Sequence, residues 1–186
     1  IISPCVHSQL YELYKLYKLY ELYELFKLIM AKNKTTFQFL SEPTDVNFGG
    51  KVHGGVVMKW IDQTAYTCAR NWSESYCVTV YVGGIRFYKS ISIGDVIKID
   101  ATVIYTGKTS IHIAVDVYAK NFSQKEYEKK THCVIVFVAV DPEGKPIEVI
   151  KWKPVTETEQ KLEKYALRLK ELRESIDDEM EQFLRH

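Results

Sequence analysis

One apolar helix followed by four long strands is the feature that most constrains how this chain can fold. Residues 53–72 carry apolar side chains at intervals of three and four, which is the spacing of one buried stripe on an α-helix. That stripe consists of Val57, Ile61, Ala65, Cys68 and Trp72. Because few charges interrupt the segment, this helix is suited to burial against a sheet.

The segments after the helix supply such a sheet. Four strands are predicted, at residues 77–88, 95–105, 109–120 and 132–140. The first three alternate apolar and polar side chains, whereas the last is continuously apolar, as expected of a strand covered on both faces. Gly83 and Gly84 stand together inside the first strand, which indicates a bulge or a close backbone approach. One more strand is expected before the helix, at residues 35–43.

This order of elements predicts an α+β fold, in which one antiparallel sheet wraps around one central helix. A single helix leaves one face and the edges of the sheet open, so the domain is expected to associate with a second copy. Residues 156–184 are predicted to form a long C-terminal helix that begins with a capping box of Thr156 and Glu159. That helix could pack on its own domain or form a short coiled-coil contact between subunits.

The N-terminal part of the chain is a simple repeat. Residues 10–28 repeat Leu-Tyr-Glu or Leu-Tyr-Lys with a period of three, so the leucines slip by about 60° per repeat and build no fixed helical face. We interpret residues 1–29 as a low-complexity gene-boundary artefact, with translation starting at Met30. The alternative is an amphipathic oligomerisation or membrane-surface helix. The rest divides into a domain at residues 30–153 and the C-terminal helix at 154–186.

Composition excludes several classes of function. The formal net charge of +1 gives no general attraction to nucleic acid or to an anionic membrane. The apolar runs are too short or too often interrupted by charge to span a bilayer. The four cysteines form no C-x-x-C pair, and the five histidines lack metal-ligand spacing, so no metal site is expected. This cysteine usage favours a reducing, cytoplasmic compartment.

The start of the apolar helix has features of a catalytic site. Gly54 and Gly55 open the helix, so their N–H groups are expected to be unpaired and accessible to a carbonyl oxygen or a developing oxyanion. Asp62 is a carboxylate on the same apolar helix, which is costly to bury unless something pairs it or uses it. Seven residues of helix span about 10 Å, so one carbonyl group cannot touch both Gly55 and Asp62 of one chain. A second subunit must then supply one of them.

Taken singly, these residues have simpler interpretations. Asp62 could be a polar position on the helix rim, and Asn47 could be an ordinary turn residue. His53 is interpreted as a helix-start residue rather than a general base. The combination is more specific than any of its members.

That combination resembles the acyl-CoA thioesterases of the hot-dog superfamily, in the branch of bacterial acyl-CoA hydrolases and brain-type cytosolic hydrolases. The matching segments are Asp45-x-Asn47, Val52-His53-Gly54-Gly55, Met58-Lys59-x-x-Asp62 with Ala65, Val78-Thr79-Val80, Ile85-x-Phe87, Gly94-Asp95-Val96, Thr109-Ser110 and Ala139 to Pro146. The resemblance covers roughly residues 35–148. One departure is Ser90, which stands near the place where the family usually carries a proline.

The resemblance implies hydrolysis of an acyl-CoA thioester to a carboxylic acid and free CoA, with no cofactor. Asp62 would act as general base or nucleophile, and Asn47 of the opposing subunit would position water or the thioester. The backbone at Gly54 and Gly55 would polarise the carbonyl group. Members of the family are dimers that commonly assemble into trimers of dimers.

CoA carries phosphates, which local basic and hydroxyl side chains could bind. The candidates are Arg86, Lys89, Lys108, Thr109, Ser110 and Lys120. Two other functions stay open. A hot-dog hydratase or dehydratase would need a proline and a histidine after Asp45-x-Asn47, and neither is correctly placed. A non-catalytic acyl-CoA binding module would keep the fold and the glycines but has no need of Asp62.

Overall fold

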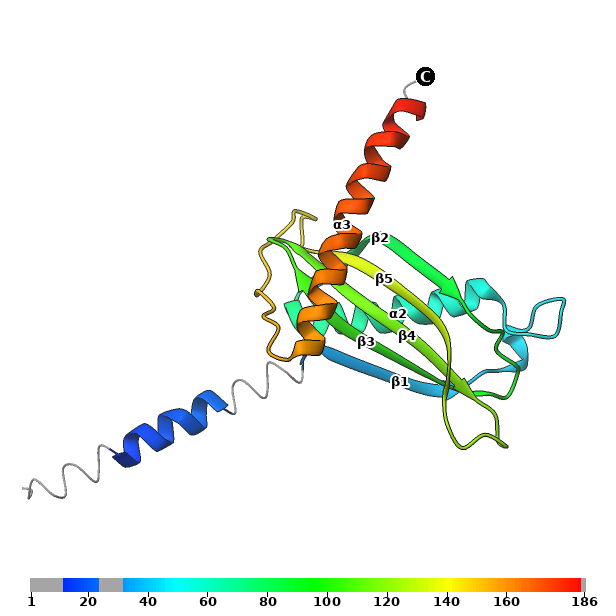
Figure 1. Cartoon of the computed structure of the whole chain (residues 1–186), viewed down its shortest axis with the longest axis horizontal. Helices are drawn as coiled ribbons and strands as arrows, with labels where there is room; N and C mark the ends of the chain where they lie inside the picture. The colour runs from blue at the N-terminus through cyan, green and yellow to red at the C-terminus, as the bar shows by residue number, and fades with distance from the viewer. Residues whose placement is uncertain (1–11, 24–31, 185–186) are drawn as a thin grey trace, which may run out of the picture. The chain divides into compact units, whose positions relative to one another are not determined.

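A computed structural model of the protein describes residues 12–23 and 32–184 (Figure 1), and the chain divides into two compact units, Ile1–Asn33 and Lys34–His186. In the first unit, residues 12–23 are helical, and their leucine and tyrosine side chains are all between 58% and 62% exposed. Such uniform exposure fits a repeat that builds no single apolar face. Met30 and the remainder of residues 1–29 lie outside the described residues. No helix within the described ranges is long and apolar enough to cross a membrane.

The second unit contains all the elements that the sequence predicts. In chain order they are β1 (Lys34–Leu40), the 3-10 turn η1 (Pro43–Asp45), α2 (Gly54–Ser73), β2 (Tyr76–Phe87), β3 (Val96–Thr106), β4 (Ser110–Lys120), β5 (Glu128–Val140) and α3 (Glu157–Leu184). β5 begins earlier than predicted, at Glu128. The capping box of α3 is confirmed, because the Glu159 carboxylate accepts the Thr156 N–H at 2.9 Å and Thr156 Oγ1 accepts the Glu159 N–H at 3.2 Å.

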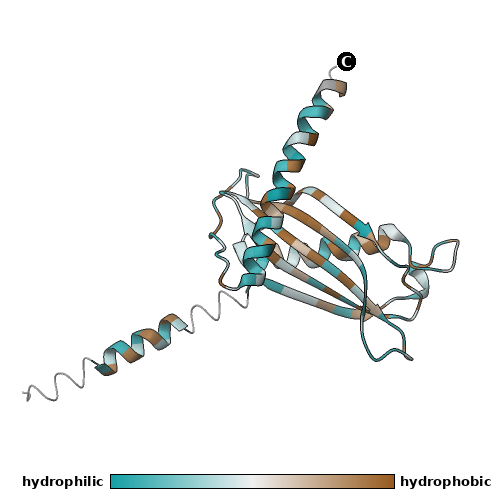
Figure 2. Cartoon of the chain, viewed as in Figure 1, coloured by the Kyte–Doolittle hydropathy of each residue, from teal (hydrophilic) through white to brown (hydrophobic). Residues whose placement is uncertain are grey.

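The five strands form one antiparallel sheet in the order β1-β3-β4-β5-β2, so β1 and β2 are its edges. α2 lies against one face, which we call the inner face. β3 carries alternating apolar and polar side chains, whereas β5 is continuously apolar from Cys133 to Val140 (Figure 2). Ile61 and Cys68 of α2 are fully buried, and Tyr66 packs its ring against Phe137 of β5. This arrangement confirms the predicted α+β hot-dog fold.

The opposite, outer face of the sheet is covered by the first half of α3. Ala166 packs with Ile104, Ala114 and Val134 in a small buried cluster, which confirms that this half packs on its own domain. Further along, Arg173 lies over the ring of Tyr81 on β2, 5.1 Å from its centroid. Beyond that point the helix continues past β2, as Figure 1 shows.

A polar network joins α3 to the same face. His132 Nδ1 lies 2.6 Å from Asp116 Oδ1, and its Nε2 lies 3.2 Å from the Tyr165 hydroxyl. Burial alone would raise the pKa of Asp116, but the hydrogen bonds from His132 and Lys129 lower it below its ordinary value. Asp116 is therefore a carboxylate at neutral pH and anchors the network beneath α3.

The bulge predicted at the paired glycines is present. The β2–β5 register shifts between Gly83 and Arg86, and Gly84 has φ +61°, a conformation that glycine adopts without strain. The turn predicted after β5 is also confirmed, since the Gly144 N–H donates to the Asp141 carbonyl at 3.0 Å.

Candidate active site

Asp62 is half-buried in the middle of α2, where it faces the first half of β2. Thr79 Oγ1 donates a hydrogen bond to Asp62 Oδ1 at 2.9 Å. Thr79 reaches the helix because it pairs with Phe137, whose side chain also points to the inner face. The register shifts again between Thr79 and Tyr81, so a bulge stands directly beside this contact. Bulges of this kind re-aim side chains at functional sites.

Asn47 lies in the loop between η1 and α2 and is half-buried. Its Oδ1 accepts hydrogen bonds from the Gly49 N–H at 2.8 Å and from the Lys51 N–H at 3.1 Å. The side chain therefore holds the turn, as asparagine often does. Its Nδ2 makes no hydrogen bond to any described residue and remains as a donor for a bound group.

The start of α2 differs in one respect from the prediction. His53 is the N-cap, and its Nδ1 accepts the Gly55 N–H at 2.9 Å. The expectation that both glycine N–H groups are unpaired was therefore wrong for Gly55. The reason is that a histidine in the extended N-cap conformation reaches the second helical N–H as a serine or aspartate cap does. The Gly54 N–H has no partner among the described residues. The interpretation of His53 as a helix-start residue is confirmed.

A hollow of about 310 Å³ opens beside Gly54, and we call it the Gly54 hollow. It is lined by Val52, Gly54, Val57, Phe87, Tyr88, Lys89, Ser90, Ile91 and Thr131. A Cβ added to Gly54 would lie 4.0 Å from the Phe87 ring, so the glycine leaves this side of the helix open. The positive end of the α2 dipole points here, which favours a carbonyl oxygen or an anion.

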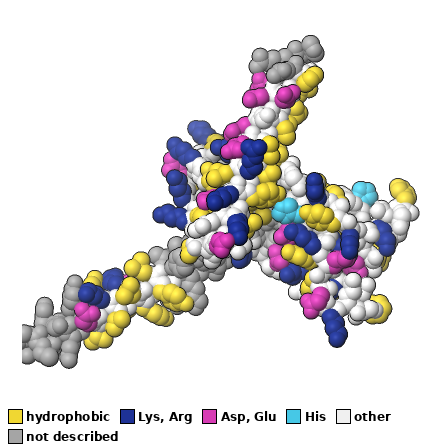
Figure 3. All heavy atoms as spheres, viewed as in Figure 1, with side chains coloured by type: hydrophobic (Ala, Val, Ile, Leu, Met, Phe, Trp, Pro, Cys, Tyr) yellow, Lys and Arg dark blue, Asp and Glu magenta, His cyan; other side chains and the backbone are white. Residues whose placement is uncertain are grey.

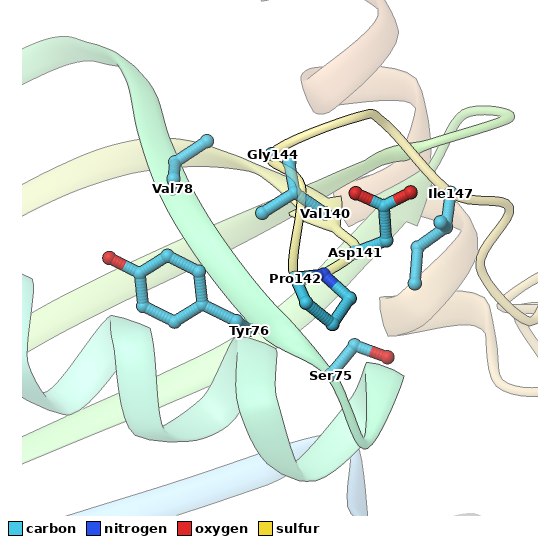
Figure 4. Close-up of a pocket in the computed structure, with 8 residues that line it drawn as sticks. All are labelled: Ser75, Tyr76, Val78, Val140, Asp141, Pro142, Gly144 and Ile147. Atoms are coloured by element: carbon cyan, nitrogen blue, oxygen red, sulfur yellow. The ribbon is translucent and has the colours of Figure 1, made fainter.

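A second hollow, of about 560 Å³, lies at the start of β2 and is lined mostly by apolar groups (Figure 4). Val78 pairs with Val138 of β5, and Val140 stands two residues after Val138. Val78 and Val140 therefore lie on the same face of the sheet as Val134, which α3 covers. Thr79 points to the other face. This hollow is therefore separate from the contact between Thr79 and Asp62.

The six predicted CoA-binding residues are not brought together in one chain. Ser110 and Lys120 stand at the two ends of β4, roughly 33 Å apart for a strand of this length. Lys108 and Thr109 lie beside Ser110, and Lys108 pairs with Glu148 at 3.1 Å.

The other three candidates stand at the far end of the sheet from Ser110. Lys120 stacks on Tyr127, 4.7 Å from the ring centroid. Arg86 pairs with His132, so it points to the outer face, away from Gly54. Lys89 alone among the six lines the Gly54 hollow, where it forms an ion pair with Glu128.

Burial disfavours the described cysteines as alternative nucleophiles. Cys68, Cys77 and Cys133 are all buried. Burial raises the pKa of Cys68 and of Cys133 to about 12, so neither thiol ionises near neutral pH. Within residues 12–23 and 32–184, no group of three or more histidine, cysteine, aspartate or glutamate side chains could hold a metal ion.

Comparison with known proteins agrees with this geometry. Residues 49–122 match the family model of the thioesterase superfamily. An uncharacterised acyl-CoA thioester hydrolase of Buchnera aphidicola is 37% identical over 118 residues, which is 62% of this chain and 87% of that protein. A solved hexameric acyl-CoA thioesterase superposes with a TM-score of 0.76 at 32% identity, over 80% of this chain and 95% of that one.

An acyl-CoA hydrolase of Staphylococcus aureus, solved with butyryl-CoA and CoA, superposes with a TM-score of 0.77 at 26% identity, over 83% of this chain and 94% of that one. That enzyme has also been solved as three variants, in which an asparagine, an aspartate and a threonine are each replaced by alanine. The three residues follow one another at the same intervals as Asn47, Asp62 and Thr79. From the sequence, Thr79 was named only within the matching segment Val78-Thr79-Val80 and was given no role in the site.

Proposed function

Because the chain belongs to the acyl-CoA thioester hydrolases of the thioesterase superfamily, we propose that Asp62 is the carboxylate through which it cleaves its substrate. The chain is an acyl-CoA thioesterase and hydrolyses an acyl-CoA thioester to a free carboxylic acid and CoA. The observation that carries the assignment of Asp62 is its hydrogen bond with Thr79, which fixes one carboxylate oxygen and leaves the other for the reaction.

In one form of the reaction, Asp62 acts as general base. It takes a proton from water as the water oxygen attacks the thioester carbon, the C–S bond breaks, and the proton passes to the CoA thiolate. In the other form, Asp62 attacks the carbon itself, the C–S bond breaks, and CoA leaves as the thiolate. Water then hydrolyses the resulting mixed anhydride, which restores the Asp62 carboxylate, and the proton released passes to the CoA thiolate. Both forms consume one water and need no cofactor, because CoA is part of the substrate.

The carbonyl oxygen develops negative charge in either form, and backbone donors stabilise it. The free Gly54 N–H at the positive end of α2 is suited to this role, with Gly55 as a second donor when His53 moves aside. Asn47 Nδ2 would hold the water or the thioester. Gly55 and Asp62 are about 10 Å apart along the helix, so these groups act together only across two subunits.

The edge strand β2 is the proposed interface of a homodimer. Tyr76, Val80, Val82 and Phe87 are between 40% and 57% exposed, which is unusual for the edge of a sheet in a monomer. An antiparallel pair centred on Gly83 sets Thr79 opposite Phe87 of the partner subunit. Because Phe87 adjoins Gly54 in each chain, this pairing joins the two halves of one site. The hexameric relative supports further assembly into a trimer of dimers.

A cytoplasmic location belongs to the same proposal. The three described cysteines form no disulfide with one another, which suits a reducing compartment.

The test is thiol release from acyl-CoAs of short to long chains, with the wild type and with Asp62→Asn. The substitution keeps the shape of the side chain and removes its charge, so the rate is expected to fall at least ~100-fold. Asp178→Asn, an exposed aspartate on α3, is the matched control. Equal activity of Asp62→Asn and wild type would refute the role of Asp62. If the wild type releases no CoA from any substrate, the hydrolase proposal fails, and hydration of crotonyl-CoA then tests the hydratase alternative.

A further inference from the structure

The second half of α3 carries an apolar stripe that its own domain does not cover. Ile176, Met180 and Phe183 are 53%, 51% and 74% exposed. They follow Leu162, Ala166 and Leu169 at the same alternating intervals of four and three, so they continue the helix face that packs on the sheet. Figure 3 shows hydrophobic side chains along one side of the helix as far as its end. The apolar face of α3 that covers the outer face of the sheet therefore continues past the edge of that sheet.

The place where α3 leaves its own sheet is the proposed dimer edge. Arg173 lies over Tyr81 of β2, and the residues after it, Glu174 to Leu184, span about 16 Å. Strands lie about 4.8 Å apart, so this length would cross roughly three strands. A sheet that continues through β2 into a second copy would lie directly beneath the stripe.

We infer that the projecting half of α3 packs on the outer sheet face of a second copy, beside that copy's own α3. This inference rests on the β2-paired dimer of the proposed function. In a pair centred on Gly83, the two copies of Tyr81 stand about 13 Å apart along the strands. Each α3 crosses the strands obliquely, so the axes of the two α3 helices lie closer together than the two copies of Tyr81. Their separation then approaches the 8–10 Å that is typical of packed helices. The two helices then run antiparallel across the dimer.

The receiving surface is the outer face near the end of β2, which we call the Arg86 strip. It comprises Arg86, Tyr88, Tyr118 and Lys129. Arg86 points outward by its pairing with His132, Tyr88 lies near Tyr165 and Lys129, and the Tyr118 hydroxyl lies 3.5 Å from Asp116. The strip therefore combines two aromatic rings with the exposed Arg86 and with Lys129, which is ion-paired with Asp116 at 2.7 Å.

The chemistry of the projecting half complements this strip. Its stripe offers Ile176, Met180 and Phe183, and thioether and aromatic groups pack well on tyrosine rings. Asp177 and Glu179 flank the stripe, whereas Glu171, Glu174, Asp178 and Glu181 lie on the solvent face, and Arg173 is the single basic residue from 171 to 184. Asp177 and Glu179 beside the stripe thus meet a surface that carries the exposed Arg86, which favours this partner over a second acidic surface.

The first test compares two double variants that introduce the same residues on opposite faces of the helix. Ile176→Ser with Met180→Ser removes the stripe, and Glu174→Ser with Asp178→Ser changes the solvent face of the same turns. All four side chains are exposed in the single chain, so neither variant removes a core contact. Sedimentation should show the dimer dissociation constant rising at least ~10-fold for the stripe variant and no more than ~2-fold for the control. Equal values would overturn the inference.

The second test identifies what the stripe contacts. One chain carries Ile176→Cys and a co-expressed chain carries Arg86→Cys, and peptide mapping after mild oxidation locates any new disulfide. A bond between positions 176 and 86 of different chains supports the inference. A bond only between two copies of position 176, or none involving it, overturns the inference. Acyl-CoA hydrolysis is measured on the same wild-type sample, so a failure of the proposed function is recorded separately from a failure of the α3 contact.

Discussion

Thr79 donates its hydroxyl hydrogen to one carboxylate oxygen of Asp62 at 2.9 Å, across the gap between an edge strand and the central helix. The bond holds the carboxylate in one orientation, so Thr79 is a positioning residue. Thr79→Val keeps the shape of the side chain and removes the donor, and we expect kcat to fall ~10- to 100-fold with little change in KM.

The control for this prediction is Thr79→Ser, which keeps the hydroxyl group and should retain most of the activity. Thermal melting distinguishes positioning from simple loss of stability, because Thr79→Val should lose kcat at temperatures where it is still folded. An equal fall of kcat in Thr79→Ser, or full activity of Thr79→Val, would contradict the positioning role.

Gly54 is needed for access rather than for the fold. A Cβ there would be 4.0 Å from Phe87, which is ordinary contact, and alanine suits a helix at least as well as glycine. Gly54→Ala should therefore melt at the same temperature as the wild type or slightly higher. Its kcat/KM should nevertheless fall ~10-fold or more, because the methyl group obstructs the N–H that would bind the carbonyl oxygen. Thermal melting and thiol release on one preparation check both parts, and full activity would exclude this N–H from the reaction.

Lys89 is expected to bind a CoA phosphate, since it lines the Gly54 hollow and carries a positive charge. Lys89→Ala should raise KM for an acyl-CoA about 10-fold, in keeping with the loss of one charge-assisted hydrogen bond. The same variant should leave KM for the corresponding acyl-pantetheine unchanged, because that substrate lacks the nucleotide. Lys108→Ala, an exposed lysine at the other end of the sheet, is the control. If Lys108→Ala raised KM and Lys89→Ala did not, the CoA phosphates would bind at the end of the sheet that carries Lys108.

The elements of the fold could be predicted because their signals are local. The stripe from Val57 to Trp72 has the helical period, and the strands alternate, so the sequence alone identifies α2 and the sheet. The early start of β5 was missed because Glu128, Lys129 and Lys130 look like a solvated turn. In the fold, Lys130 is buried and its charge is neutralised by Glu128 at 2.6 Å.

The site was only partly predictable, because its contacts join residues that are distant in sequence. Asp62 stood out as a charge on an apolar helix. Thr79 carried no such signal, since a threonine is ordinary in a strand, and only the folded sheet brings it to the helix. The six predicted CoA-binding residues do not come together in one chain, and the sequence could not show this for the same reason. The sequence shows that Arg86 and Lys108 are basic, but only the fold shows that Lys108 lies in the turn between β3 and β4, at the opposite end of the sheet from Arg86.

His112 should make the protein sensitive to mild acid. It is buried on β4 with its ring against Tyr105, 5.1 Å between centroids, and Ser110 Oγ lies 3.4 Å from its Nε2. Burial lowers its pKa to about 4, together with the positive charges of Arg173 and Lys170 of α3, which act in the same direction. The unfolded chain, in which histidine titrates near 6.5, therefore binds more protons than the folded chain between about pH 4 and 6.5.

The stabilisation due to neutral His112 is fully present above pH 6.5 and is lost as pH falls toward 4, by roughly 3 kcal/mol at most. His112→Phe keeps a ring against Tyr105 and cannot be protonated, so its free energy of unfolding should depend less steeply on pH over this interval. Urea unfolding at several pH values checks this. Because Arg173 and Lys170 belong to α3, the acid effect should appear first as loosening of that helix, visible as faster amide exchange around Ala166. Identical pH slopes for His112→Phe and wild type would mean that His112 is protonated in the folded protein as readily as in the unfolded chain.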